Sequence, residues 1–282
     1  MYVLVRPVLF ALTDRFPDFF IQHNSDTSSS QEFYLWPSVT QAAKNALDMR
    51  YRLLDYIYTA FHQAHEDGTP VLNPLFYKYP KDVNTFGIDL QFLYGDSILV
   101  SPVTEENATS VDIYLPNDIF YDFLTLRPIQ GHGANITLSD VNFTSIPVHI
   151  RGGAILPLRV EGAMTTKELR SKDIEFVIAS GLDGTASGSL YMDDGVSITP
   201  QNFTEISMKY KGSKFTLSGT FGHAPGVKVS SISVLNSAKV PGVAKLNGST
   251  IPSSSIQYDR DSKILKIQLG FEFTGPFEVS FT

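Results

Sequence analysis

Hydrophobic and polar positions follow two different periods along the chain, and the change comes near residue 68. Between residues 38 and 67, apolar side chains recur mostly at steps of three and four residues, as on one face of an α-helix. Ser38 and Gln41 have the spacing of a capping box, and Gly68 is a typical residue at a helix C-terminus. The pattern therefore predicts one long helix at about 38–67, whose wide apolar stripe packs on a larger body.

After residue 68, short apolar segments alternate with turns rich in Gly, Pro, Asn and Asp. The segments have four to eight residues and are rich in Val, Ile, Phe, Tyr and Thr, which is typical of strands. No helical period of any length returns, so the pattern predicts all-β sandwich architecture. The less regular stretch at 157–172 is predicted to join two sandwiches. The clearest predicted strands are 97–100, 111–115, 146–150, 174–179, 189–192, 214–219, 229–235 and 264–269.

Composition narrows the class of protein and of partner. The chain has 282 residues, of which 43% are hydrophobic, enough for a core that extends over two domains. Its net charge is −7 and no basic run stands out, so a nucleic-acid partner is not expected. No apolar run approaches the roughly 20 residues of a membrane-spanning helix. The absence of cysteine excludes disulfides, thiolate zinc sites and cysteine nucleophiles.

Sequons for N-glycosylation are more frequent than chance provides. Five are present, where the frequencies of Asn, Ser and Thr predict about two. A Ser/Thr-rich turn composition is the alternative explanation. We expect that the parent protein is secreted and carries sugars on surface loops, although residues 1–12 do not form a clear signal peptide. The acceptor residues are Asn107, Asn135, Asn142, Asn202 and Asn247.

Several sequence blocks occur in the order typical of one enzyme family. The main ones are 19–24 (FFIQHN), 31–34 (QEFY), 95–103 (GDSILVSPV), 146–158 (IPVHIRGGAILPL) and 190–195 (LYMDDG). From about residue 19 onwards the chain resembles the C-terminal part of a glycoside hydrolase family 31 enzyme, most like secreted fungal α-glucosidases. The resemblance implies that residues 1–68 are the remnant of the last part of a (β/α)8 barrel, closed by the predicted helix. It further implies a proximal antiparallel β-sandwich at 69–165 and a distal one at 166–282.

The resemblance also implies where the chemistry lies. A retaining glycosidase places two carboxyl groups about 5 Å apart across the scissile bond. In family 31 these are two aspartates that precede this region, so no catalytic residue is expected here. The carboxylates nearest the barrel remnant, Asp14, Asp18, Asp26 and Glu32, match no catalytic motif of the family. The chain is thus expected to be the C-terminal portion of an α-glucosidase for α-1,4-linked glucosides such as maltooligosaccharides, inactive without its N-terminal catalytic half and without a cofactor.

One substrate-binding residue is implied by the family motif. His23 stands where the family has a histidine that hydrogen-bonds the glucosyl unit in the −1 subsite. The motif departs from the family at Ile21 and Gln22, where Arg-Asn is usual. Asp55 replaces a frequent proline, and Leu124 replaces a common tryptophan. Both of these replacements are expected to loosen local packing.

Other interpretations remain open on the sequence. The β-rich part can act as a non-catalytic module that binds carbohydrate or stabilises a barrel, or as a freestanding β-protein of unrelated function. His62 and His65 have a spacing that can hold a metal, but no third ligand is evident, and a helix face is the simpler interpretation. Asp193-Asp194-Gly195 resembles the start of a calcium loop, but the rest of that loop's pattern is missing, and an Asx-turn at a strand end explains the motif more simply.

Overall fold

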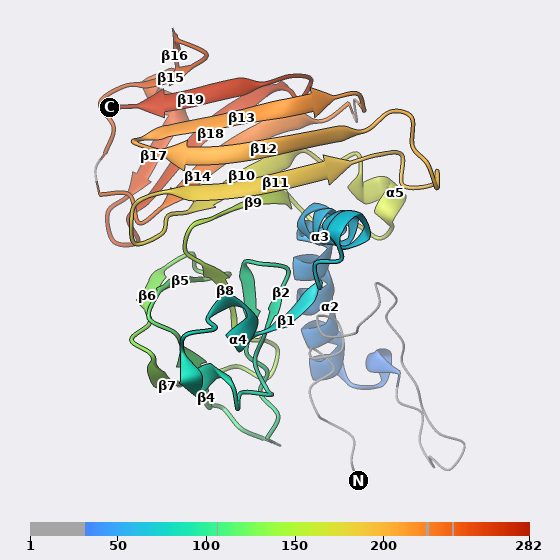
Figure 1. Ribbon diagram of the computed structural model, residues 1–282, viewed down its shortest axis with the longest axis vertical. Coiled ribbons are helices and arrows are strands. Elements are labelled where there is room, and N and C mark those ends of the chain that lie inside the picture. The colour runs from blue at the N-terminus through green and yellow to red at the C-terminus, as the bar shows by residue number, and fades with distance from the viewer. Residues whose placement is uncertain (1–31, 106, 224–225, 239) are drawn as a thin grey trace.

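A computed structural model describes residues 32–105, 107–223, 226–238 and 240–282, and most of their regular structure is β-strand. In Figure 1 a large sheet, coloured yellow to red, lies above a smaller group of green and cyan strands. No helix among the described residues is long and apolar enough to cross a membrane. The helical elements are η1 (Phe33–Leu35), α2 (Pro37–Arg52), α3 (Leu54–Asp67), α4 (Leu75–Lys78), η2 (Val83–Thr85), α5 (Thr166–Leu169) and η3 (Ser253–Ser255).

The predicted single helix at 38–67 is in fact two helices, so that prediction is wrong. α2 and α3 meet at Leu53, whose ψ of −1° departs from the helical value, and Figure 1 shows the two helices running in different directions. Neither proline nor glycine lies at the bend. Leu53 is only 1% exposed in the core beneath the helices, and α3 packs on both β9 and β11 beyond it. The bend therefore follows the shape of the core that the two helices cover.

The helix ends differ in how far the sequence predicted them. At the start of α2 the N-cap is Trp36, without a side-chain hydrogen bond, so the capping box of Ser38 and Gln41 does not form. Pro37 occupies the first helical position, where its missing N–H has no partner to lose. At the end of α3, Gly68 takes a φ of +79° and its N–H donates to the carbonyl of Ala64 at 3.1 Å. The predicted glycine stop is confirmed.

The apolar stripe of the two helices is largely covered by strands of this same chain. Ala42, Ala46, Met49, Leu53 and Ile57 belong to one buried cluster together with strand residues from both sheets. A helix with such a stripe needs a partner layer, and among the described residues that layer is the β-structure.

The smaller group of strands forms two layers. A six-stranded sheet and a separate two-stranded pair enclose an apolar cluster that includes Leu75, Leu99, Ile113 and Phe120. The six-stranded sheet has the order β1 (Leu72–Pro74), β2 (Phe92–Tyr94), β3 (Ile98–Val100), β8 (Val148–Arg151), β5 (Ile119–Asp122) and β6 (Pro128–Gln130). The pair is β4 (Val111–Leu115) and β7 (Ala134–Leu138).

The large sheet has eleven strands and curls over its own core. Phe176 from the middle of the sheet lies 5.6 Å from Phe215 and 6.2 Å from Phe277, ring centre to ring centre, although their strands are far apart in the strand order. The order is β16 (Ser249–Thr250), β15 (Ala244–Leu246), β19 (Phe277–Phe281), β13 (Lys214–Phe221), β12 (Thr204–Lys211), β11 (Ala186–Met192), β9 (Ala154–Arg159), β10 (Ile174–Ala179), β14 (Lys228–Leu235), β18 (Ile264–Glu272) and β17 (Ile256–Asp259).

The middle of the large sheet serves two cores at once. On β10, Ile174, Phe176 and Ile178 face the interior of the curled sheet, whereas Val177 and Ala179 face the cluster beneath the helices. Strands buried on both faces are nearly continuous apolar runs in the sequence, and β10 fits this pattern apart from Glu175. The predicted boundary between residues 165 and 166 falls in the connection between β9 and β10, and it stays a prediction.

The predicted strands are present in the structure, but not all strands pair in the predicted antiparallel manner. Each of the eight predicted strands overlaps a strand of the structure, and mainly β architecture is confirmed. The expectation of purely antiparallel sandwiches is wrong, because β10 pairs with β14 in parallel, with Phe176 opposite Ile232. Three strands come between β10 and β14 along the chain, and that length allows a parallel crossover.

Candidate functional site

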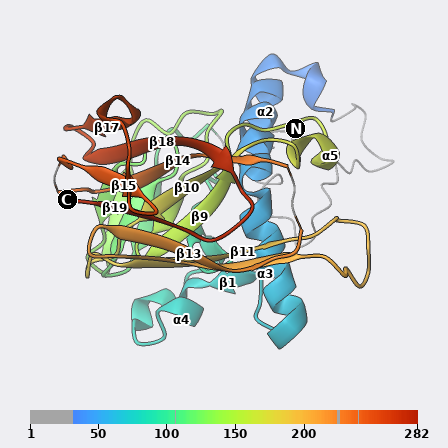
Figure 2. The same ribbon diagram turned by 90° about the horizontal axis from the view of Figure 1, so that it is seen from above.

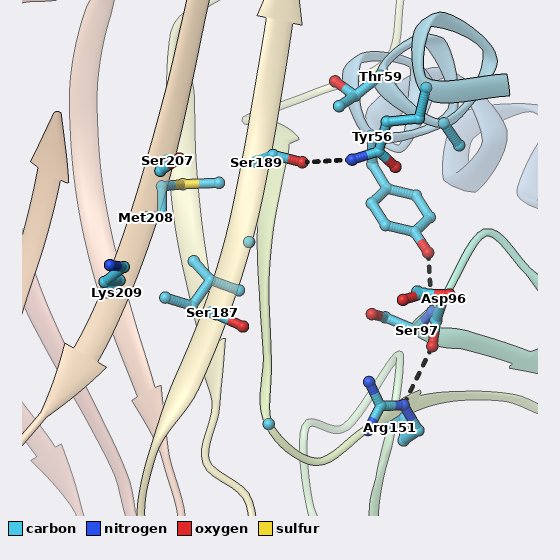
Figure 3. Close-up of a pocket in the computed structure, with 15 residues that line it drawn as sticks. Tyr56, Thr59, Asp96, Ser97, Arg151, Ser187, Ser189, Ser207, Met208 and Lys209 are labelled. Carbon is cyan, nitrogen blue, oxygen red and sulfur yellow. Dashed lines mark hydrogen bonds between the residues drawn. The ribbon is translucent and has the colours of Figure 1, made fainter. Parts of the chain in front are cut away.

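Polar residues gather where α3 meets the two sheets, around a cleft of about 310 Å³. Figure 3 shows the cleft, with α3 on one side, the turn at Asp96 and Ser97 below it, and β11 and β12 opposite. The outward positions of β11 and β12 contribute small hydroxyl side chains and the amine of Lys209. The lining is therefore mostly neutral and rich in hydrogen-bonding groups.

One wall of the cleft is fixed by the Tyr56 side chain. Its hydroxyl donates to the carbonyl of Tyr94 at 2.8 Å. It also accepts from the N–H of Ser97 at 2.9 Å (Figure 3). Burial raises the pKa of Tyr56, so the phenol stays neutral and can keep donating. A side chain on Gly95, which has a φ of +59°, would come within 2.3 Å of the Tyr56 hydroxyl. Glycine is thus required both by the backbone and by the close approach.

The charged groups of the cleft do not make a hydrolytic pair. Asp96 is the one carboxylate among the residues that line it, and it is ion-paired with Lys78 at 2.9 Å. The Arg151 guanidinium donates to the carbonyl of Asp96 at 3.0 Å (Figure 3). It also donates to the carbonyl of Gly152 at 3.1 Å. Cleavage with retention needs two carboxyl groups on either side of the scissile bond. The cleft lacks the second one, and its polar groups hold the two sheets and the helix together.

A buried ion pair ties the start of α3 to β9. Arg159, 1% exposed, donates to the two carboxylate oxygens of Asp55 at 2.5 and 3.1 Å, and also to the carbonyl of Lys172 at 2.6 Å. The bidentate geometry satisfies both charges, as a buried pair requires. Asp55 was expected to loosen the packing as a replacement for proline. That expectation is wrong, because Asp55 is the partner of a fully buried arginine.

A second polar contact joins the middle of α3 to the end of β11. The Tyr58 hydroxyl lies 2.9 and 2.8 Å from the two carboxylate oxygens of Asp193, and Arg170 lies 3.8 Å from the same carboxylate. Burial and the hydrogen bond to Asp193 raise the pKa of Tyr58 to about 12. One turn of helix away from Asp55, the Thr59 hydroxyl accepts the N–H of Tyr191 at 2.9 Å. α3 is thus held on β11 by side-chain hydrogen bonds as well as by apolar contact.

The motif Asp193-Asp194-Gly195 forms turns, as the simpler interpretation predicted. Asp193 accepts the N–H of Gly195 at 2.8 Å, and Asp194 accepts the N–H groups of Val196 at 3.0 Å and Ser197 at 2.9 Å. Bonds from the hydroxyl and N–H of Ser197 and from the N–H of Val196 lower the pKa of Asp194 to about 2. The Asx-turn interpretation is confirmed.

The histidines with metal-like spacing do not converge with other ligands. His62 stacks on the ring of Tyr191, with ring centres 3.6 Å apart and planes within 10°, while His65 is exposed. His149 is 1% exposed on β8, and burial lowers its pKa. Across the described ranges, no three His, Asp or Glu side chains come together as a metal site would need.

The remaining predicted site residues divide into two groups. His23, Asp14, Asp18 and Asp26 lie outside the described residues. The five sequon asparagines are all exposed; Asn135 lies on β7, whereas the other four lie in turns or loops. Their placement is that of acceptors open to modification, and their occupancy stays a prediction.

Two domain descriptions of one enzyme family match neighbouring parts of this chain. The family 31 TIM-barrel domain matches residues 15–60, and the family 31 C-terminal domain matches residues 68–156. A probable alpha/beta-glucosidase of Aspergillus fumigatus is 48% identical over 271 residues, which is 95% of this chain and 29% of that protein. This chain belongs to glycoside hydrolase family 31. A further probable alpha/beta-glucosidase, from Arthroderma benhamiae, is 47% identical over 96% of this chain and 31% of its own length.

Solved family 31 structures show the same fold. The Tris-bound crystal structure of glucosidase II alpha subunit superposes with a TM-score of 0.79 at 27% identity, over 90% of this chain and 30% of that one. A family 31 dextranase of Flavobacterium johnsoniae superposes with a TM-score of 0.74 at 21% identity, which speaks for the fold alone. The chain spans about 30% of the length of these relatives and corresponds to their C-terminal portion.

The polar contacts that join α3 to β9 and β11 were the main feature of this family 31 chain that the sequence did not predict. We call this region the junction around α3. Asp55 and Arg159 are 104 residues apart, and Tyr58 and Asp193 are 135 apart. One signal was available: Arg159 ends the apolar run of β9, where a charge signals a buried partner. Nothing in the sequence named that partner.

Proposed function

We propose that this chain is the C-terminal portion of an α-glucosidase that hydrolyses α-1,4-linked glucosides with retention of configuration. The observation that carries the proposal is the identity of 48%, over 95% of this chain, to a relative named as an alpha/beta-glucosidase. In this proposal the chain contributes the last part of the barrel and two β-units, and the reacting aspartates belong to the portion that precedes it.

The proposed role of the chain is to complete and hold the catalytic portion. Two features support it. The Asp55–Arg159 pair and the Tyr58–Asp193 contact fix α3 on the β-structure, so the helices are presented to a barrel in one orientation. His23 would then add a hydrogen bond to the glucosyl unit, from a motif that lies just before α2 in the sequence.

A secreted, glycosylated parent protein is the second part of the proposal. Its support is the number of sequons and the exposure of all five asparagines. Mass spectrometry of the protein purified from a fungal host, before and after glycosidase treatment, tests it. We expect a mass loss and deamidated asparagine at one or more of the five positions; unmodified peptides at all five would contradict it.

Activity on mixing tests the main proposal. The preceding portion of the Aspergillus fumigatus relative is co-expressed with this chain, and hydrolysis of p-nitrophenyl α-glucoside and maltose is followed. We expect no turnover by the chain alone and turnover by the pair. Retention of the chain on starch, without turnover by the pair, would instead favour a carbohydrate-binding module. Turnover by the chain alone would overturn the proposed division of labour.

A further inference from the structure

An exposed apolar surface lies on the first β-region, away from the cleft at α3. It is formed by Phe76 and Tyr77 of α4 and by Val83 and Phe86 at η2, and we call it the α4–η2 patch. The exposed fractions of these side chains are 42%, 49%, 70% and 57%. Figure 2 shows α4 standing out at the edge of the molecule. Large apolar side chains that gather at the surface mark sites of interaction.

The centre of the patch is a contact between two of its aromatic rings. The rings of Phe76 and Phe86 meet edge to face, with centres 6.1 Å apart. The N–H of Phe86 donates to the carbonyl of Val83 at 3.3 Å within the η2 turn. Tyr77 follows Phe76 on the same helical turn. Phe76 and Phe86 therefore form the centre of the patch, and Tyr77 and Val83 lie on the same two turns of the chain.

The backbone beneath the patch is held in place by buried neighbours. Leu75 is 1% exposed in the core, and the Tyr79 hydroxyl donates to Asp118 at 3.0 Å, so the two ends of the α4 turn are anchored. Thr85 is fully buried and donates to the carbonyl of Asp82 at 2.7 Å. The Tyr114 hydroxyl donates to the Asp82 carboxylate at 2.7 Å. Because the inward positions serve the core, the outward aromatic rings have no role in it and are presented ready for a partner.

The chemistry of the patch favours a protein partner over a sugar. A glucan chain stacks on flat, coplanar aromatic platforms, whereas the planes of Phe76 and Phe86 stand at 85° to each other. A groove of about 630 Å³ lies beside the patch, between Tyr79, Tyr114 and Lys81. None of the four patch side chains lines this groove, but the exposed aromatic rings next to it are of the kind that is enriched in protein–protein interfaces.

We propose that the α4–η2 patch docks the portion of a family 31 polypeptide that precedes this region in its relatives; this inference rests on the proposed function. A (β/α)8 barrel takes about 250 residues, yet the barrel description matches only residues 15–60 of this chain. The relatives are about three times as long as the part that this chain covers. A large folded body is thus available to cover the patch, and the rim at Lys81 predicts acidic residues at the edge of that body.

Co-purification tests the proposal. The preceding portion of the Aspergillus fumigatus relative, carrying an affinity tag, is co-expressed with the full 282-residue chain. The test variant is Val83→Asp/Phe86→Asp. The matched control is Val196→Asp/Ile198→Asp, which puts the same charges on side chains that are 88% and 100% exposed in the β11–β12 loop. We expect at least a tenfold loss of co-purified chain for the test variant and none for the control. Circular dichroism and melting of each purified chain show that both variants fold.

Several results would overturn the docking proposal. One is a test variant that co-purifies as well as the control, and another is a wild-type chain that fails to co-purify at all. A chain that elutes alone as a dimer, and becomes a monomer in the test variant, would assign the patch to a second copy. Retention on starch that the test variant loses would assign it to a glucan.

Hydrolysis by the co-purified pair separates this inference from the proposed function. A pair whose formation depends on the patch but which has no activity leaves the docking inference standing, and the proposed function fails. An active pair that also forms with the test variant sustains the function and overturns the docking inference.

Discussion

The interior of the curled eleven-stranded sheet and the junction around α3 both hold parts of the fold together, but through different interactions. In the interior, Phe176 is surrounded by Phe215, Phe273 and Phe277, and the cluster consists of apolar and aromatic side chains. At the junction, the contacts between layers include the buried pair of Asp55 and Arg159. The stability of the interior depends on the volume and apolar area that it buries. The stability of the junction depends on the placement of particular hydrogen-bonding atoms.

The comparison teaches where each region is vulnerable. An apolar core loses stability in proportion to the contacts and volume removed, and similar residues can replace each other. A buried ion pair contributes little net stability when intact but costs a great deal when one partner is removed. The junction is therefore sensitive to changes that conserve size, whereas the interior is sensitive to changes that do not.

The largest effect is expected in the interior. Phe176→Ala removes an aromatic side chain that is fully buried, and should lower the free energy of unfolding by about 4 kcal/mol. Urea unfolding followed by fluorescence and far-UV circular dichroism measures the change. Phe176→Leu should cost much less, and an equal loss from both variants would mean that volume does not govern this core.

The second effect sharpens the contrast, because it keeps size nearly constant. Arg159→Met should lower the free energy of unfolding by about 3 kcal/mol, since Asp55 would keep a charge beneath the helices without its donors. Adding Asp55→Ala to that variant should restore part of the loss. If the losses of Arg159→Met and of Asp55→Ala alone add up to the loss of the double variant, the two residues are not energetically coupled.

A smaller loss is expected at the contact between α3 and β11. Tyr58→Phe removes only the hydroxyl that donates to Asp193, and should cost about 1.5 kcal/mol at neutral pH. Burial and the bond to Asp193 raise the pKa of Tyr58 to about 12. A raised pKa in the folded state means that the stabilisation is complete below the unfolded pKa of about 10 and is lost as the pH rises towards 12. Unfolding midpoints at pH 8 to 12 should therefore fall less steeply for Tyr58→Phe than for the wild type, and parallel curves would contradict this.

The smallest effect tests a helix end that the sequence predicted. Gly68 has a φ of +79°, and Gly68→Ala should cost about 1 kcal/mol because a Cβ is strained in that conformation. Gly87→Ala is the matched control, since it has open space around it and no positive φ. Thermal unfolding of the two variants should show a lower midpoint for Gly68→Ala alone. Equal midpoints would argue against backbone strain at this cap.

The same contrast explains what could be predicted from the sequence. β10 was predicted with its observed bounds, because a short run rich in apolar, β-branched and aromatic residues is a local property of the sequence. The stop at Gly68 is local as well. The bend at Leu53, the parallel pairing of β10 with β14 and the partners of Asp55 and Tyr58 depend on residues more than fifty positions away or on the shape of the whole core. Periodicity carries no information about such partners.

Covalent trapping tests the central claim, that the chain supports a glucosidase without supplying its reacting carboxylates. The pair of this chain and the preceding portion of the Aspergillus fumigatus relative is incubated with 5-fluoro-α-glucosyl fluoride, and peptides are mapped by mass spectrometry. We predict a single glycosyl label, on an aspartate of the preceding portion, and none on this chain. A labelled carboxylate within these 282 residues would contradict the account.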